Sequence, residues 1–82
     1  MMRSVFEFYY KGIEKFNSGD YKGAIDYFSK EIALSSSFPE TFICRGYARY
    51  RIGDRDGALM DWLEASERGD NNVDDLIEKY FN

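Results

Sequence analysis

Two stretches of the chain decide the fold: FYYKGIEKFNSGDYKGAIDYF at 8–28 and FICRGYARYRIGDRDGALMDW at 42–62. Shifted by 34 residues they share six identities, which in the first stretch are Phe8, Gly12, Gly19, Asp20, Gly23 and Ala24. A fixed period indicates a repeat architecture, in which each unit buries its apolar face against the next unit. The chain therefore divides into repeat one at 5–38, repeat two at 39–72, and the first turns of a third unit at 73–82.

Each repeat has the pattern of two helices joined by a tight turn. Phe8, Gly12 and Phe16 are four residues apart, which places them on one face of a helix. The Gly19-Asp20 pair predicts the end of that helix and the start of the next, because glycine favours the left-handed C-terminal position and aspartate caps an N-terminus. The second unit repeats this plan. We expect Gly12 and Gly46 to lie where paired helices cross, against Ala24 and Ala58.

Residues 73–81 predict an amphipathic helix that caps the second hairpin. Its apolar residues are spaced three and four apart: Val73, Leu76, Ile77 and Tyr80. Repeat arrays need such a cap because the last unit otherwise leaves its apolar side open. We expect it to lie near Leu59, Trp62 and Leu63.

The composition excludes several classes of partner. The 82 residues include 11 Lys+Arg and 15 Asp+Glu, for a net charge of −4 and an isoelectric point near 4.7. Nucleic acids and anionic membranes need clustered cations, so we expect neither as a partner. No apolar run approaches the ~20 residues of a membrane span, and the first residues lack the apolar segment of a secretory signal. With a single Cys and no leader pattern, we expect a cytoplasmic location.

No residue pattern indicates catalysis, a metal ion or a cofactor. The chain has no His, the commonest general base and metal ligand, and no phosphate-binding or nucleophile motif. We interpret two groups of acidic residues as helix N-terminal carboxylates favoured by the macrodipole: Asp54, Asp56 and Asp61, and Asp70, Asp74 and Asp75. Cys44 is interpreted as a structural thiol, and Arg68-Gly69-Asp70 as a glycine-capped helix end. We expect no enzyme, no metal site and no cofactor.

The 34-residue helix-turn-helix unit resembles the tetratricopeptide repeat. The matching residues are Phe8, Gly12, Ala24 and Phe28 in the first unit, and Phe42, Gly46, Ala58, Trp62 and Ala65 in the second. The tail from Ala65 to Phe81 is similar to the last repeat and C-terminal capping helix of bacterial members. The resemblance implies an all-α fold, with antiparallel helical hairpins stacked as a short right-handed α-solenoid of about five helices in a single domain, 1–82. A related repeat family has a longer unit and fits less well.

Charged residues depart from the family pattern. Lys11 and Arg45 precede the glycines where the family often has Leu or Asn, and Lys15 and Arg49 stand where it has Tyr. Glu31 replaces a small residue that faces a neighbouring helix. Because an unpaired buried carboxylate is unfavourable, we expect Glu31 to pair with Arg45 or Arg49, or else to reach solvent.

The resemblance also implies a binding site beside the packing face. In the family this sector of each first helix lines a concave groove that receives a peptide or helix of a partner. The residues at this sector, which we predict to form the partner-binding groove, are Tyr9, Ile13, Ile43, Tyr47 and Arg51. The alternative is that part of this stripe only packs against neighbouring helices, and Phe6 and Tyr10 fit either interpretation. The groove lacks the Lys and Asn with which some members clamp a C-terminal carboxylate.

Two functions fit these observations. The first is a non-catalytic protein-protein interaction module, an adaptor or scaffold that binds a peptide or helix of a partner protein in an aromatic groove. The alternative is a self-associating structural unit that forms a homodimer through the same apolar face. Sedimentation of the isolated protein at several concentrations distinguishes them, because only self-association makes its sedimentation coefficient depend on its own concentration.

Overall fold

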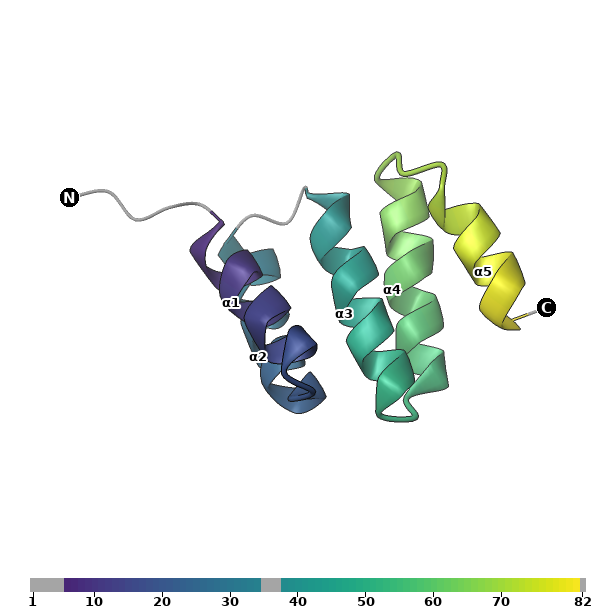
Figure 1. Ribbon diagram of the computed structural model, residues 1–82. Helices are drawn as coiled ribbons and strands as arrows, with labels where there is room; N and C mark the ends of the chain where they lie inside the picture. Colours follow the sequence, from purple (N-terminus) through teal and green to yellow (C-terminus); the bar gives the residue numbers. More distant parts are fainter. Residues whose placement is uncertain (1–5, 35–37, 82) are drawn as a thin grey trace.

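The computed structural model describes residues 6–34 and 38–81, and these two stretches form five α-helices and no strand. The helices are α1 Glu7–Asn17, α2 Tyr21–Leu34, α3 Pro39–Arg51, α4 Arg55–Glu67 and α5 Val73–Phe81. Each helix packs against the next one in the sequence, so the hairpins α1–α2 and α3–α4 stack and α5 covers the second hairpin (Figure 1). The predicted all-α solenoid of antiparallel hairpins is confirmed.

The same Gly-Asp turn ends α1, α3 and α4. Its glycines have φ values of 87° at Gly19, 90° at Gly53 and 105° at Gly69, a region that side chains with a Cβ rarely adopt. The aspartate that follows each glycine accepts a hydrogen bond from the backbone N–H three residues further on, at 2.9, 2.9 and 3.2 Å. In each pair the glycine therefore ends one helix and the aspartate caps the N-terminus of the next. The interpretation of Arg68-Gly69-Asp70 as a capped helix end is confirmed.

Gly12 and Gly46 make room for aromatic rings. A Cβ built at Gly12 would lie 2.5 Å from Cε1 of Phe28, and one at Gly46 would overlap the indole of Trp62. Both rings are fully buried. The nearest neighbours are thus not the expected Ala24 and Ala58 but the ring one turn further along each return helix.

The apolar core has two clusters, one for each hairpin. Ala24 and Phe28 pack with Ala48 of α3, so the first cluster extends into the second hairpin. The second cluster includes Phe42, Trp62, Ala65 and Val73, with α5 residues packed against it. The rings of Tyr80 and Phe81 lie 5.6 and 5.7 Å from that of Trp62, between centroids. α5 therefore covers Trp62 as predicted, whereas Leu63 remains 49% exposed.

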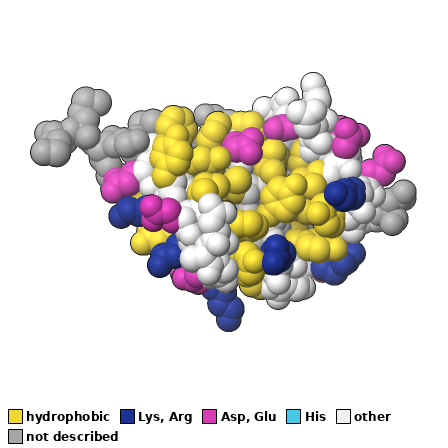
Figure 2. All heavy atoms as spheres, in the orientation of Figure 1, with side chains coloured by type: hydrophobic (Ala, Val, Ile, Leu, Met, Phe, Trp, Pro, Cys, Tyr) yellow, Lys and Arg dark blue, Asp and Glu magenta, His cyan; other side chains and the backbone are white. Residues whose placement is uncertain are grey.

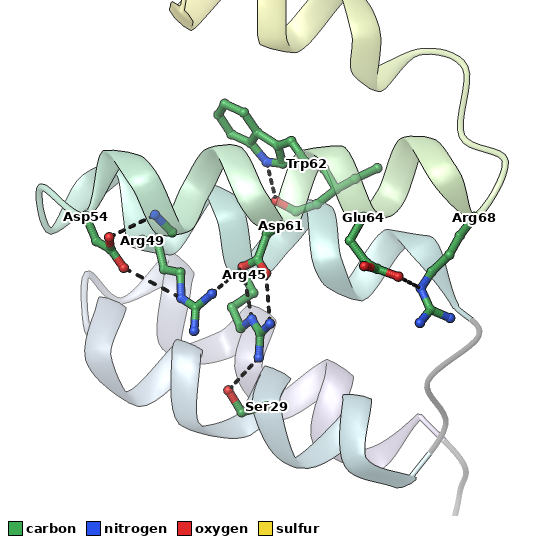
Figure 3. Close-up of polar contacts among 10 residues, drawn as sticks. Ser29, Arg45, Arg49, Asp54, Asp61, Trp62, Glu64 and Arg68 are labelled. Carbon is green, nitrogen blue, oxygen red and sulfur yellow. Dashed lines mark hydrogen bonds and ion pairs between the residues drawn. The ribbon is translucent and has the colours of Figure 1, made fainter.

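A partly buried network of ion pairs and hydrogen bonds joins α2, α3 and α4 (Figure 3). Asp61 is 3% exposed and accepts hydrogen bonds from Nε and Nη2 of Arg45 at 2.9 and 2.8 Å, a bidentate geometry. Arg49 Nη1 donates to the same carboxylate at 3.1 Å, and Arg45 Nη1 donates to Ser29 Oγ at 3.0 Å. The interpretation of Asp61 as a helix N-terminal carboxylate is wrong, because it lies in the middle of α4 and faces α3.

Glu31 lies outside this network. Its side chain has no exposed surface, and neither carboxylate oxygen has a hydrogen-bond partner among the described residues. The prediction that Glu31 pairs with Arg45 or Arg49 or reaches solvent is therefore wrong. Both guanidinium groups instead pair with Asp61 of α4.

Candidate interaction groove

The face made by α1, α3 and α5 carries a band of hydrophobic side chains (Figure 2). Within the described residues three hollows lie on it, of about 410, 340 and 210 Å³. The first lies between α5 and the N-terminal part of α3, the second between the C-terminal ends of these helices, and the third between α1 and α3. We call this surface the groove, and its lining residues include Ile13, Phe16, Ile43, Cys44, Tyr47, Arg51, Leu76 and Tyr80. Tyr47 lines all three hollows.

The structure places most of the predicted site residues on the groove. Those that line it are Ile13, Ile43, Tyr47 and Arg51. Tyr9 lies outside these three hollows, with its ring packed against Phe28 and Phe38 at centroid distances of 6.1 and 5.6 Å. Burial raises the pKa of the Tyr9 hydroxyl. The Tyr9 ring is therefore half-buried among aromatic rings at the N-terminal ends of α1 and α3.

The two residues that fitted either interpretation, Phe6 and Tyr10, lie beside Tyr9. Phe6 is 36% and Tyr10 61% exposed. The Phe6 ring lies 5.2 Å from that of Phe38 and 6.5 Å from that of Tyr10, between centroids. They form an aromatic group at the N-terminal ends of α1 and α3, and neither lines the three hollows.

Three aromatic residues on the groove were not predicted. Phe16, Tyr50 and Tyr80 line the hollow at the C-terminal ends of α3 and α5. Phe16 and Tyr50 occupy matching repeat positions that were assigned to packing, and Tyr80 was assigned to the cap. The ring of Tyr80 lies 4.9 Å from that of Tyr50 and 6.5 Å from that of Tyr47, between centroids. α5 therefore forms a wall of the groove as well as a cap, which its amphipathic pattern alone does not show.

Charged side chains are distributed unevenly along the groove. Glu40, Asp70 and Asp75 line the hollow at the N-terminal ends of α3 and α5, together with Lys79. Arg51 lines the hollow at the other end, with its guanidinium 4.8 Å from the centroid of the Tyr21 ring. In Figure 2, the part of this face formed by α3 and α5 has acidic side chains along one edge and basic ones nearer the other.

Burial and the Glu40 carboxylate suppress ionisation within the groove. Burial, and then the negative charge of Glu40, raise the pKa of the Cys44 thiol to about 11. Burial also raises the pKa of the Tyr47 hydroxyl, with Tyr80 the next contribution. Cys44, which is half-buried and free, stays a thiol at neutral pH, whereas a nucleophilic cysteine must be a thiolate. The groove offers packing and hydrogen bonding to a ligand.

Comparison of the chain with models of protein families finds no match, and comparison with curated proteins finds no significant similarity. Within the described residues no three acidic or Cys side chains are grouped so as to hold a metal ion. None of the described helices combines the length and apolar character needed to cross a membrane.

Proposed function

We propose that this chain is a tetratricopeptide-type repeat domain that acts without catalysis in the cytoplasm, binding a peptide or helix of a partner protein in the groove. One observation carries the proposal: the three hollows on one face converge on Tyr47. Tyrosine is enriched at binding hot spots, because its ring gives a large contact area and its hydroxyl a hydrogen bond.

Removal of the Tyr47 side chain tests the proposal. Immobilised wild-type protein is expected to retain a specific partner from a lysate, and Tyr47→Ala to lose it. Because the Tyr47 ring also packs 5.4 Å from that of Trp62, between centroids, circular dichroism must first show that the variant is folded. Met60→Ala is the matched control, since Met60 is 70% exposed on α4, outside the groove. Equal capture by Tyr47→Ala and wild type would exclude the groove as the binding site.

Self-association through the same apolar face is the alternative. Several large apolar side chains are exposed outside the groove as well, among them Leu34, Met60 and Leu63. Sedimentation at several concentrations separates the two functions. A concentration-independent monomer excludes the homodimer, whereas a tight dimer in which Tyr47 becomes protected makes a second copy the occupant of the groove.

A further inference from the structure

The part of the groove between α3 and α5 has the length of a short helix. One hollow lies at each end of it, and Tyr47 lines both. From Glu40 to Arg51 the helix α3 advances eleven residues, which is ~16 Å at 1.5 Å per residue. About three turns of a helix laid along α3 cover this distance.

The walls of this part favour a helical ligand over an extended one. Ile43, Leu76 and the rings of Tyr47 and Tyr80 line it, and both walls are helices whose backbone groups are already bonded internally. An extended peptide would find few partners there for its own N–H and C=O groups. A helix satisfies its backbone internally and presents apolar side chains at i, i+3, i+4 and i+7 to such a groove.

The two ends of this part of the groove carry side chains of opposite charge. Among the described residues, neither Glu40 nor Asp75 at the acidic end forms an ion pair, and Arg51 at the basic end forms none. Arg55 adds a second cation at the basic end, where Nη2 donates to the backbone carbonyl of Tyr80 at 3.3 Å. Lys79 also lines the acidic hollow, with its ammonium 5.5 Å from the centroid of the Tyr80 ring.

We propose that the groove binds an amphipathic helix whose charges run opposite to its own. A basic side chain lies over Glu40 and Asp75, and an acidic one lies about eleven residues away, beside Arg51. Since a helix dipole favours acidic residues at the N-terminus and basic residues at the C-terminus, the ligand runs antiparallel to α3. This inference rests on the proposed function and adds the chemistry and direction of the partner segment.

The test uses two fluorescent synthetic peptides of about 15 residues, roughly four helical turns, with the same stripe of Leu, Ile and Phe. The first has Glu near its N-terminus and Lys eleven residues later, and the second has Lys at both positions. Binding is followed by anisotropy at low ionic strength, where exposed charges are least screened. The protein variants are Arg51→Glu and the double variant Glu40→Lys with Asp75→Lys. Glu67→Lys is the control, because it also replaces an acidic side chain by a lysine, but at an exposed site on α4, outside the groove.

Wild type is expected to bind the first peptide roughly fivefold more tightly than the second. This factor is about what one exposed ion pair contributes to an affinity. Arg51→Glu should reverse this preference, the double variant should weaken binding of the first peptide by a similar factor, and Glu67→Lys should change neither.

Binding that depends on Tyr47 but is indifferent to all these charges would overturn this inference and leave the proposed function standing. Wild type that binds neither peptide overturns the inference too, whereas peptide binding unchanged by Tyr47→Ala counts against the proposed function itself.

Discussion

At the scale of single residues, Gly46 and Trp62 show how one position decides the packing of a hairpin. The indole Nε1 donates to the backbone carbonyl of Ile43 at 3.0 Å because α3 presents no side chain at Gly46. Gly12 faces the ring of Phe28 in the same way. In an exposed helix a change from Gly to Ala stabilises by about 1 kcal/mol. At Gly46 the added methyl group would displace a buried ring, so the same change is expected to destabilise the protein.

We expect Gly46→Ala to lower the free energy of unfolding by ~1–3 kcal/mol, as overpacked cores do, and Gly46→Leu to lower it further. Thermal unfolding followed by circular dichroism measures both. Ala33→Leu is the control, since Ala33 is exposed on α2 and its replacement should stay within ~0.5 kcal/mol of wild type. A Gly46→Ala protein that melts at or above the wild-type temperature would contradict the role assigned to the indole.

Glu31 is a second residue whose environment predicts whether a substitution stabilises or destabilises the protein. It occupies the repeat position that Ala65 fills in the second unit, and it is buried with both oxygens unpartnered among the described residues. An unsatisfied buried polar group costs about 1–3 kcal/mol. We therefore expect Glu31→Ala to raise the free energy of unfolding by roughly 1 kcal/mol or more, less any loss from the cavity it leaves.

Chemical denaturation compares Glu31→Ala with wild type and with Asp26→Ala, a control at an exposed acidic residue of the same helix. The control should change stability little. A clear destabilisation by Glu31→Ala would show that the carboxylate has a stabilising role at this position.

At the scale of elements, α5 both caps the second hairpin and forms a wall of the groove. Val73 is 2% exposed and belongs to the second core cluster, and Leu76, Ile77 and Tyr80 pack against that cluster. Leu76 and Tyr80 also line the groove. A helix that only capped the array could be replaced by any helix with the same apolar stripe. α5 could not, because its charged residues also face the groove.

Deletion of residues 73–82 is expected to destabilise the protein by several kcal/mol or to drive it to associate. Each large side chain contributes about 1.5–3 kcal/mol when fully buried, and on α5 Val73 is buried while the larger apolar side chains are partly buried. Trp62, the only Trp in the chain, is covered by α5, so its fluorescence emission should shift to longer wavelength. Glu78→Ala, an exposed change on α5, is the control. A truncated chain that stays monomeric and melts like wild type would show that α5 is not a cap.

At the scale of the whole molecule, charge and packing connect the two hairpins. Arg45 reaches from α3 to Ser29 on α2 and to Asp61 on α4, so one side chain contacts both hairpins. Ala48 of α3 packs with Phe28 of α2 at the same boundary. These contacts pack α2 against α3; α1 and α3 also contact each other and line one hollow, and α3 and α5 line another. The groove is the surface that this stacking leaves, and no single hairpin contains it.

The local sequence determined the helices, their turns and their pairing. The pairs Gly19-Asp20 and Gly53-Asp54 set the backbone conformation of their immediate neighbours. The same pattern recurs after 34 residues, so the turns and the repeat can both be recognised from the sequence. Most of the groove on α1 and α3 was predictable too, because Ile13 and Tyr47 occupy one sector of the repeat.

Where residues of distant segments could pair in more than one way, the packing of whole helices selects the partner. The sequence offered Glu31 as the partner of Arg45 or Arg49, but the packing of α4 against α3 pairs both arginines with Asp61, and the Glu31 oxygens have no hydrogen-bond partner among the described residues. In the same way, Tyr9 packs on Phe38, and Tyr80 becomes part of the groove, through the placement of whole helices. Such choices depend on distances between segments, which the spacing of residues along one helix does not contain.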